Sequence, residues 1–289
     1  MFKLGAISDG ISNDLARAVE VISRAGLPYV ELQSVWGKPI GSLSDDEVGD
    51  VRRITRDAGL KVSCLSHKNL FGAMPVLATE VGDANHESHM KTMQRVIAIA
   101  RELDAEVIRI MCFRKEAVLF GSNGADGAVV TSGAWDKFVR LMVPPIRLAE
   151  REGVRLVMEN STKGMVTSAW LGRKIVDDIG SPALKVLWDP SNALYYNEVP
   201  YPNGYDVLRG GYLGHLHIKD SFADIPRARI DFAALGEGQM APHLEPLAQS
   251  LSRDGYQGCI SLESLYRPAG GGPEEGFAAS LPRLKALFG

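Results

Sequence analysis

The regular alternation of β-like and helical segments is the feature that most constrains the fold of this 289-residue chain. Eight short apolar runs recur along it, and nearly every one is followed by a segment whose apolar residues have helical spacing. Alternation of this kind predicts a parallel sheet with helices packed outside it. The expected strands are Lys3–Ser8, Tyr29–Gln33, Lys61–Ser66, Glu106–Cys112, Val154–Met158, Leu184–Trp188, Leu213–Ile218 and Gly258–Leu262.

The segments between these strands carry helix start and stop signals. Ser44 followed by Glu47 has the spacing of a capping box, and Gly59 closes the same helix. The expected helices are Leu15–Ala25, Ser44–Ala58, His86–Leu103, Ala134–Arg151, Ser168–Ile179, Ala241–Arg253 and Glu274–Phe288.

These elements favour a single (β/α)₈ TIM barrel over a doubly wound open sheet. The length is near the ~250 residues typical of such barrels. Most strands read apolar throughout, as expected when both faces of a parallel sheet are buried. No G-x-G-x-x-G follows the first strand, where a dinucleotide fold would need it. No linker or internal repeat divides the chain, so we expect one domain over residues 1–289.

The bulk composition excludes several classes of partner. The formal net charge of -3 gives no general attraction to nucleic acid or to an anionic membrane. No apolar stretch approaches the ~20 residues of a transmembrane helix, and the N-terminal residues contain no apolar stretch long enough to predict a signal peptide. Cys64, Cys112 and Cys259 each lie inside an apolar run, which predicts buried, reduced thiols. We therefore expect a cytoplasmic protein that binds neither nucleic acid nor membrane.

Four polar residues follow or end the last four expected strands: Glu159, Asp189, His217 and Glu263. In a parallel barrel these strand ends open into one mouth. Carboxylates that converge there repel one another, and a bound cation removes that cost. Three carboxylates and one imidazole suit one divalent ion, with Mn²⁺ as first choice and Mg²⁺, Co²⁺ or Zn²⁺ as alternatives.

Each of these residues also has an ordinary structural interpretation. Asp189 stands before a proline and could start a turn. His217 could be a hydrogen-bonded core histidine, and His215 shares its strand face and is a rival ligand. Glu263 could pair with Arg267. The recurrence of the pattern on four successive strands favours the metal hypothesis.

Five short motifs give the chain a family resemblance. They are MEN at Met158–Asn160, WDPSN at Trp188–Asn192, HLHIKD at His215–Asp220, GEG at Gly236–Gly238 and LES at Leu262–Ser264. On these motifs the chain resembles the xylose isomerase-like TIM-barrel superfamily, the sugar phosphate isomerase/epimerase group. That group includes ketose 3-epimerases, inosose isomerases and dehydratases and, more distantly, endonuclease IV. The resemblance covers essentially the whole chain.

The resemblance implies roles for the four strand-end residues. It implies that Glu159, Asp189, His217 and Glu263 bind one divalent metal ion. It also implies that Glu159 and Glu263 act as an acid/base pair on opposite faces of the substrate, and that the protein is an oligomer.

The chain departs from the family pattern at the substrate side. Asn192 stands where epimerases and endonuclease IV commonly have a histidine, and we expect it to contact substrate. Ala223 stands where epimerases have an arginine, with Arg227 and Arg229 further on. The chain has only six histidines, too few for the three-metal site of endonuclease IV. A nuclease would also want a basic face.

The predicted activity is metal-dependent isomerisation or epimerisation of a keto-sugar or cyclitol. The metal would polarise a carbonyl, and a carboxylate would move the adjacent proton through a metal-stabilised enediolate. The same site could serve a lyase, either a dehydratase or a keto-glycoside-cleaving eliminase. A DNA repair nuclease and a non-catalytic barrel that binds a partner subunit remain as alternatives. No Gly-rich phosphate cradle is found, which favours an unphosphorylated carbohydrate.

A second set of residues is expected around the metal. His67 could act as an acid/base or contact substrate. Lys219 could hold a substrate oxygen, or could instead pair with Asp220. Trp36 is expected to line the pocket, and Arg114 to reach an anionic substrate.

Further residues are expected to support the site. Asn160 is expected to orient its neighbours, Glu31 could line the pocket, and Arg109 is placed in the interior or flank of the fourth strand. Two irregular segments, Arg114–Gly133 and Tyr195–Tyr205, are expected to close over the metal and exclude water.

Overall fold

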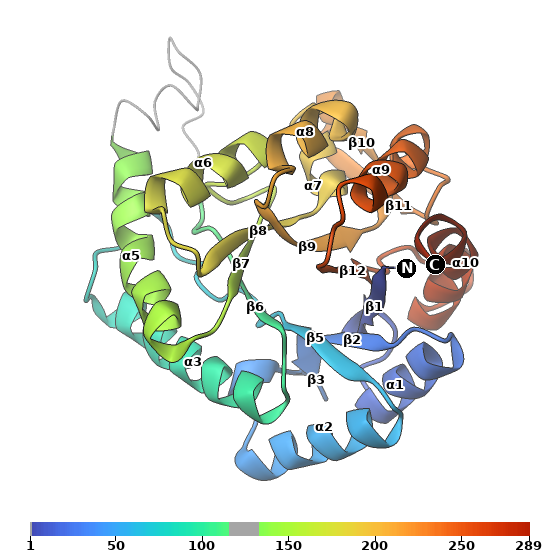
Figure 1. The fold of residues 1–289 in the computed structure, drawn as a ribbon, viewed down its shortest axis with the longest axis horizontal. Helices are drawn as coiled ribbons and strands as arrows, with labels where there is room; N and C mark the ends of the chain where they lie inside the picture. Colours follow the sequence, from blue (N-terminus) through green and yellow to red (C-terminus); the bar gives the residue numbers. More distant parts are fainter. Residues whose placement is uncertain (1, 116–132) are drawn as a thin grey trace.

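A closed barrel of parallel strands forms the centre of the computed structural model, which describes residues 2–115 and 133–289 (Figure 1). The order around the barrel is β1 (Lys3–Ile7), β12 (Cys259–Leu262), β9 (Leu213–Ile218), β8 (Leu184–Trp188), β7 (Leu156–Glu159), β6 (Val107–Ile110), β5 (Lys61–Leu65) and β2 (Tyr29–Leu32). β1 pairs in parallel with both β2 and β12, which closes the ring. The predicted (β/α)₈ barrel is confirmed.

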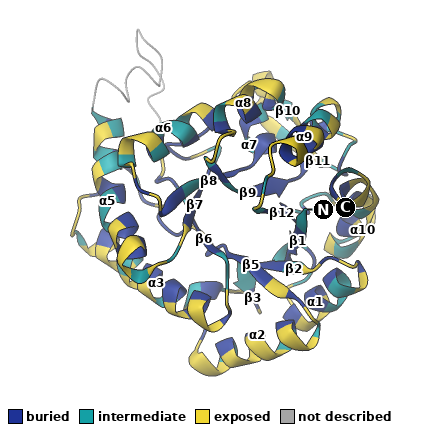
Figure 2. Ribbon diagram, in the orientation of Figure 1, coloured by how far each residue is buried: buried dark blue, intermediate teal, exposed yellow. Residues whose placement is uncertain are grey.

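Helices surround this barrel, and both chain ends lie beside β1 and α10 (Figure 1). The long helices are α1 (Leu15–Arg24), α2 (Asp45–Asp57), α3 (Ala84–Glu102), α5 (Ala134–Glu152), α6 (Ala169–Ile179), α9 (Ala241–Arg253) and α10 (Pro273–Phe288). The short ones are η1 (Ser8–Gly10), η2 (Ile40–Ser42), α7 (Pro190–Leu194), η3 (Pro200–Gly204), α8 (Tyr205–Leu208) and η4 (Ile225–Arg227). The predicted capping box of Ser44 and Glu47 is present. Figure 2 shows the helices buried on the barrel side and exposed outside.

The barrel strands are buried on both faces, as their apolar sequences predict. The outward side chains pack against the helices in one large core. Inside the barrel a small separate cluster is formed by Cys64, Val107, Val157 and Leu187. Because side chains alternate along a strand, residues two apart from these also face inward, toward the two ends of the barrel. All three cysteines are buried and free.

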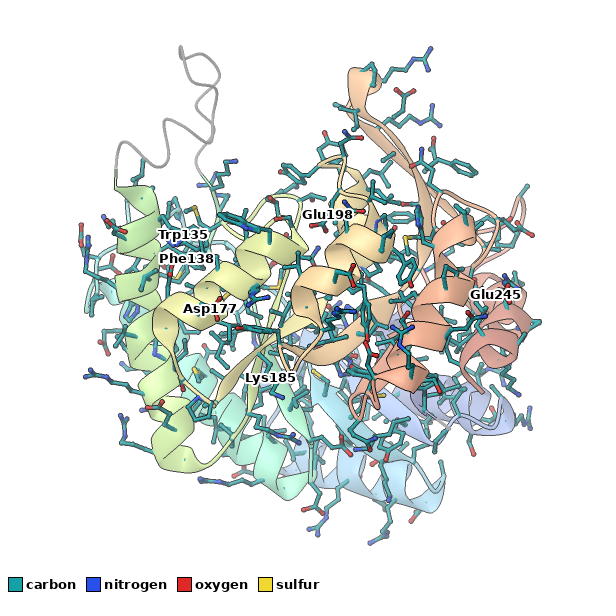
Figure 3. The ribbon with its side chains drawn as sticks, turned by 45° about the horizontal axis from the view of Figure 1, so that its top comes forward. Trp135, Phe138, Asp177, Lys185, Glu198 and Glu245 are labelled. Carbon is teal, nitrogen blue, oxygen red and sulfur yellow. The ribbon has the colours of Figure 1, made fainter. Side chains whose placement is uncertain are left out.

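Two antiparallel hairpins interrupt the connections at the carboxyl end of the barrel. β3 (Ser34–Val35) pairs with β4 (Lys38–Pro39), and β10 (Asp220–Asp224) pairs with β11 (Arg229–Ala233). The second hairpin rises from the barrel in Figure 3. The alternation of strands and helices does not predict either one, because the first has two-residue strands and the second contains a proline at its turn.

No helix in the described part of the chain is both long enough and apolar enough to cross a bilayer.

Candidate metal centre

The four predicted ligands come together at the carboxyl end of the barrel. Glu159 ends β7, Asp189 follows β8, His217 lies near the end of β9 and Glu263 follows β12. These four strands are neighbours in the barrel. One ligand atom from each residue lies within 4.8 Å of those from the other three. Glu263 is partly exposed and the other three are buried, so the cluster opens on the side of Glu263.

The His217 ring is oriented as a metal ligand would be. Its Nε2 lies 2.9 Å from Glu31 Oε1, while its Nδ1 lies 3.4 Å from Glu159 Oε1 and 4.0 Å from Glu263 Oε2. The Nδ1 atom is buried and has no hydrogen-bond partner in the described part of the chain. An unpaired buried nitrogen is costly, and a carboxylate on the other ring nitrogen is typical of metal-bound histidine. The residues present therefore fit a divalent cation.

His215, the rival ligand, lies below the cluster rather than in it. Its Nε2 is 2.8 Å from Glu31 Oε2 and 3.2 Å from Ser261 Oγ. Glu31, Cys64 and His215 also have ligand-type atoms within 4.8 Å of one another. The Glu31 oxygens, however, already accept hydrogen bonds from both histidines. We therefore interpret this lower group as the support of His217.

Glu31 does not line the pocket as expected but lies fully buried beneath the cluster. Burial alone would raise the pKa of Glu31, but His217 and His215 outweigh it and hold the pKa well below its usual range. Ser66 Oγ donates a further hydrogen bond to the same carboxylate. Glu31 is therefore an ionised anchor for the two rings.

Arg109 extends the cluster on the side of Glu159. Its Nη1 donates to Glu159 Oε2 at 2.7 Å, and its Nη2 donates to Gln33 Oε1 at 2.7 Å and to the Ser66 carbonyl at 2.9 Å. Burial raises the pKa of Glu159, but Arg109 and His217 oppose it and bring the pKa down to about 2. The sequence offers one signal for this contact, since Arg109 is the single charged residue inside the apolar run VIRI.

Lys219 bridges the other two carboxylates. Its Nζ lies 2.5 Å from both Asp189 Oδ2 and Glu263 Oε2. Burial lowers the pKa of Lys219, but these two carboxylates raise it above its usual value, so the ammonium is retained. The alternative pairing of Lys219 with Asp220 is wrong. Asp220 instead accepts from backbone amides of the Gly236–Gly238 turn, which explains the GEG motif structurally.

The carboxylates of the cluster differ in acidity. Burial raises the pKa of Asp189 to about 6, with Lys219 opposing and Glu263 and Glu159 adding to the rise. For Glu263 burial is outweighed by Lys219 and His217, so its pKa is lowered. The alternative pairing of Glu263 with Arg267 does not form, since the Arg267 guanidinium donates to backbone carbonyls instead.

Two asparagines connect the ends of β7 and β8. Asn160 donates through Nδ2 to the Asp189 carbonyl at 2.9 Å and accepts from the Asp189 amide at 2.7 Å. Asn192 Nδ2 donates to the Asn160 carbonyl at 3.0 Å. Asn160 thus orients Asp189 as expected, and the structure assigns the Asn192 amide to the same local network.

The remaining expected residues make no hydrogen bond or ion pair with the four clustered side chains in the part of the chain that the structure describes. His67 follows β5, is buried, and its Nδ1 has no hydrogen-bond partner among the described residues, while burial lowers its pKa. Trp36 sits in the β3–β4 turn and is 36% exposed. Arg114 is exposed, and its backbone pairs with Pro75 and Gly164. Most of the expected closing segment, residues 116–132, lies outside the described residues.

The second expected closing segment, Tyr195–Tyr205, is largely ordered into short helical turns. Tyr201 OH contacts Ser250 Oγ at 3.0 Å, and Tyr196 OH donates to the Thr162 carbonyl at 2.5 Å. These contacts fix the segment against neighbouring elements of the barrel.

Comparison with solved structures shows the same fold in several proteins of low sequence identity to this chain. A protein named IolI with a bound zinc atom matches with a TM-score of 0.75 and 15% identity, covering 99% of this chain and 98% of that one. The 3-keto-D-glucoside 4-epimerase YcjR from E. coli matches with a TM-score of 0.70 and 17% identity, and the match covers 99% of this chain and 100% of that one. The probable 3-DHS dehydratase AsbF from Bacillus anthracis matches with a TM-score of 0.72 and 14% identity, and the match covers 98% of this chain and 99% of that one.

Sequence comparison gives a match at the level of the family. A search of curated proteins found no match. The family model for the xylose isomerase-like TIM barrel matches residues 19–287. Since this match spans nearly the whole barrel, the chain belongs to the xylose isomerase-like TIM-barrel family.

Proposed function

We propose that this protein is a divalent-metal-dependent enzyme that moves a proton beside a carbonyl group of a small keto-sugar or cyclitol, as an isomerase or epimerase. The observation that carries the proposal is the convergence of Glu159, Asp189, His217 and Glu263, with no hydrogen-bond partner for the His217 Nδ1 among the described residues. Structural neighbours named as a keto-glucoside epimerase and a psicose epimerase support a carbohydrate substrate.

The four converging side chains would hold the cation, for which Mn²⁺ is the first choice. When bound, it would polarise a substrate carbonyl and offset the negative charge that develops on the carbonyl oxygen. Lys219 keeps a second positive charge in the same place, between Asp189 and Glu263. Arg109 holds Glu159 in position from the opposite side.

Glu263 is the group best placed to take the proton. Its side chain is 17% exposed, and within residues 2–115 and 133–289 only its Oε2 is hydrogen-bonded, to Lys219. Glu159 is 6% exposed, with Oε2 held by Arg109 and Oε1 facing His217. The pair expected to share proton transfer is therefore unequal, and we assign the first abstraction to Glu263.

The difference in exposure and hydrogen bonding between Glu263 and Glu159 favours a lyase as the second candidate. Epimerisation needs an acid on the substrate face opposite the base. Glu159, with a pKa of about 2, would be almost fully ionised near neutral pH and would seldom carry the proton that such an acid must donate. Elimination of a β-substituent needs one carboxylate base and a leaving group on the substrate. Glu263 alone could act as that base. The similarity in fold to a probable dehydratase agrees with this alternative.

Incubation of the Mn²⁺-loaded protein with keto-sugars and inososes in D₂O tests the proposal. Deuterium at the carbon beside the carbonyl, in recovered or isomerised sugar, would support an isomerase or epimerase. Release of water or of an aglycone with an unsaturated product would support the lyase. Turnover that persists after complete removal of the metal by chelator would overturn both.

A further inference from the structure

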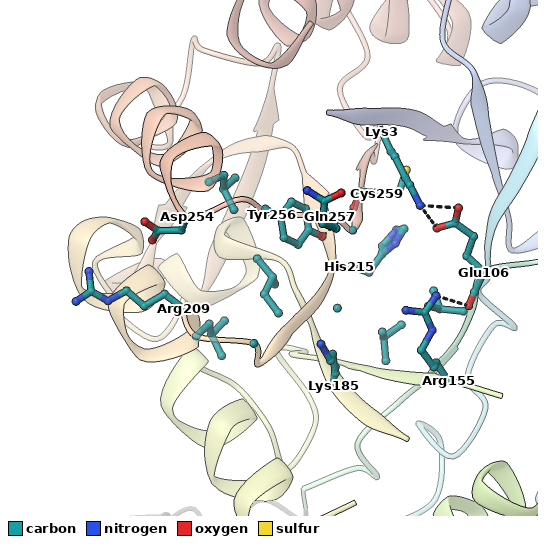
Figure 4. Close-up of a pocket in the computed structure, with 18 of the residues that line it drawn as sticks. Lys3, Glu106, Arg155, Lys185, Arg209, His215, Asp254, Tyr256, Gln257 and Cys259 are labelled. Carbon is teal, nitrogen blue, oxygen red and sulfur yellow. Dashed lines mark hydrogen bonds and ion pairs between the residues drawn. The ribbon is translucent and has the colours of Figure 1, made fainter. Parts of the chain in front are cut away.

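A cavity lies at the amino-terminal end of the barrel, opposite the candidate metal centre. Its volume is about 370 Å³, within the roughly 300–1,000 Å³ of small-ligand pockets. Side chains from the starts of β1, β7, β8 and β12 line it, together with the loops before β9 and β12 (Figure 4).

The strands that carry the metal ligands place cations at this other end. On β8, Lys185, Leu187 and Asp189 share the inner face because they are two residues apart. Arg155, just before β7, stands in the same relation to Glu159 at the end of that strand. Each of these two strands therefore runs from a cation beside the cavity to a carboxylate in the metal centre.

Lys185 has no hydrogen bond or ion pair with any described residue, although it is half-buried. Among the residues that the structure describes, the Arg155 guanidinium makes one long contact, to the Glu106 carbonyl at 3.4 Å, and none with a carboxylate. Lys3 differs, because it pairs with both Glu106 oxygens at 2.7 and 2.8 Å. Figure 4 shows Lys185 and Arg155 directed into the cavity. Arg155 is exposed, whereas Lys185 is partly buried, and partial burial of its uncompensated charge is unfavourable until a counter-charge arrives.

The other charged residues of the lining do not supply that counter-charge. Arg209 and Asp254 point away from the centre in Figure 4. Arg209 pairs with Asp206, and Asp254 accepts from Tyr205 OH at 2.9 Å. Glu106 is already neutralised by Lys3.

Glycine on the adjacent strand makes room for Lys185. A Cβ on Gly214 would lie 2.8 Å from both Lys185 Cβ and Val157 Cγ1. The Gly210–Gly211 loop forms another part of the wall with no side chains.

We propose that this amino-terminal cavity binds a small oxyanion, of the phosphate type, through Lys185 and Arg155. An ammonium provides a point charge for such a group, and a guanidinium can contact two of its oxygens at once. The occupant would lie beside His215, which lines the cavity and contacts the Glu31 carboxylate that also holds His217. The site is thus separate from the metal centre but connected to it by hydrogen bonds.

Calorimetric titration of the full-length protein with inorganic phosphate tests this site, with and without prior removal of metal by chelator. We expect saturable binding in both states below about 10 mM phosphate. Lys185→Gln and Arg155→Gln should each weaken binding about tenfold, which corresponds to loss of one charge-assisted contact. The matched control is Lys61→Gln, since Lys61 is an exposed lysine at the start of β5 that lies outside this cavity. It should bind phosphate as the unaltered protein does.

Thermal unfolding of each variant establishes that it is folded, and Arg155→Gln stands in if Lys185→Gln does not fold. A parallel titration with glycerol 3-phosphate identifies the source of the anion. If glycerol 3-phosphate binds more tightly than inorganic phosphate, the cavity is assigned to a phosphorylated metabolite. If it binds more weakly, the cavity is assigned to the free ion. Binding that disappears with the metal, or that all three substitutions weaken equally, would overturn the proposal, as would no binding at all.

Discussion

The Glu31 carboxylate lies beneath His217 and contacts its Nε2 at 2.9 Å, which directs the Nδ1 of the same ring toward Glu159 and Glu263. A carboxylate in this position fixes the ring orientation and favours the proton on Nε2. The remaining nitrogen then presents its lone pair to the centre of the cluster. The arrangement explains why a strand of the opposite half of the barrel contributes to a site built from β7, β8, β9 and β12.

Replacement of Glu31 by glutamine should lower metal affinity about 10- to 100-fold, the usual effect of losing such a supporting carboxylate. The ring would lose its ionic anchor while all four ligands remained. Competition between Mn²⁺ and a chelating dye measures the affinity. Glu106→Gln is the matched control, because Glu106 pairs with Lys3 at the other end of the barrel. Equal affinities for the two variants would contradict the role assigned to Glu31.

The fold and the convergence of Glu159, Asp189, His217 and Glu263 could be predicted from sequence because both depend on local patterns. Each strand is a short apolar run, and each ligand stands at or just beyond the end of one. Parallel neighbours in a barrel bring their carboxyl ends together, so position along the chain predicts position in space. The same reasoning predicts that Asn160, which is adjacent to Glu159, orients its neighbours.

The contacts around the ligands could not be predicted because they join strands that are far apart in sequence. Arg109 reaches Glu159 across 50 residues, and Glu31 reaches His217 across 186. The choice of Lys219 between Asp220 and the pair Asp189 and Glu263 depends on which way its side chain points. Alternation on β9 places Lys219 inward with His217, whereas Asp220 starts a hairpin that the barrel pattern does not contain.

Replacement of Arg109 by methionine should destabilise the fold by about 3–5 kcal/mol, because it leaves Glu159 buried without its partner. Urea unfolding of the metal-free protein measures the change. The double variant with Glu159→Gln should recover much of the loss, since the uncompensated charge is then removed. A double variant as unstable as the sum of the two single variants would indicate that Arg109 acts only through Gln33 and Ser66.

The same Arg109 substitution should change how metal binding depends on pH. Arg109 holds the pKa of Glu159 at about 2, whereas burial alone raises it above 4.5. Without the guanidinium, protons should compete with the metal at higher pH, and binding should be lost earlier as the pH falls. Metal affinity measured between about pH 4 and 7 would show this shift. Superimposable pH profiles for the two proteins would contradict it.

Replacement of Glu263 by glutamine should reduce kcat by about 10²- to 10⁴-fold, the range lost with a general base. The amide keeps a ligand oxygen, so metal should still bind, although more weakly. Single-turnover rates at saturating metal separate the proton-transfer role from metal binding. Glu237→Gln, an exposed glutamate in the turn after β11, is the control and should keep its rate. A Glu263→Gln variant of near-normal rate would remove the assignment of the base.

Stability should fall with rising pH because of Glu198, which lies at the carboxyl end of the barrel (Figure 3). Its two carboxyl oxygens lie 2.9 and 3.2 Å from the Ala169 amide at the start of α6. Burial raises the pKa of Glu198 from 4.5 to about 7, although backbone hydrogen bonds oppose the shift. The folded state thus favours the protonated carboxyl. Its contribution is complete below about pH 4.5 and is lost as the pH rises through about 7.

Glu198→Gln should remove this dependence, because the neutral amide can still accept from Ala169 at every pH. Relative to the unaltered protein, the variant should gain roughly 1 kcal/mol of stability at pH 8 and little at pH 5, after allowance for partial exposure. Urea unfolding across this range measures the difference. The exposed Glu245 provides the control, since Glu245→Gln should leave the profile unchanged. A constant difference between Glu198→Gln and the unaltered protein from pH 5 to 8 would show that the carboxyl does not titrate with folding, and that the amide acts only through packing against Trp188 and Gly204.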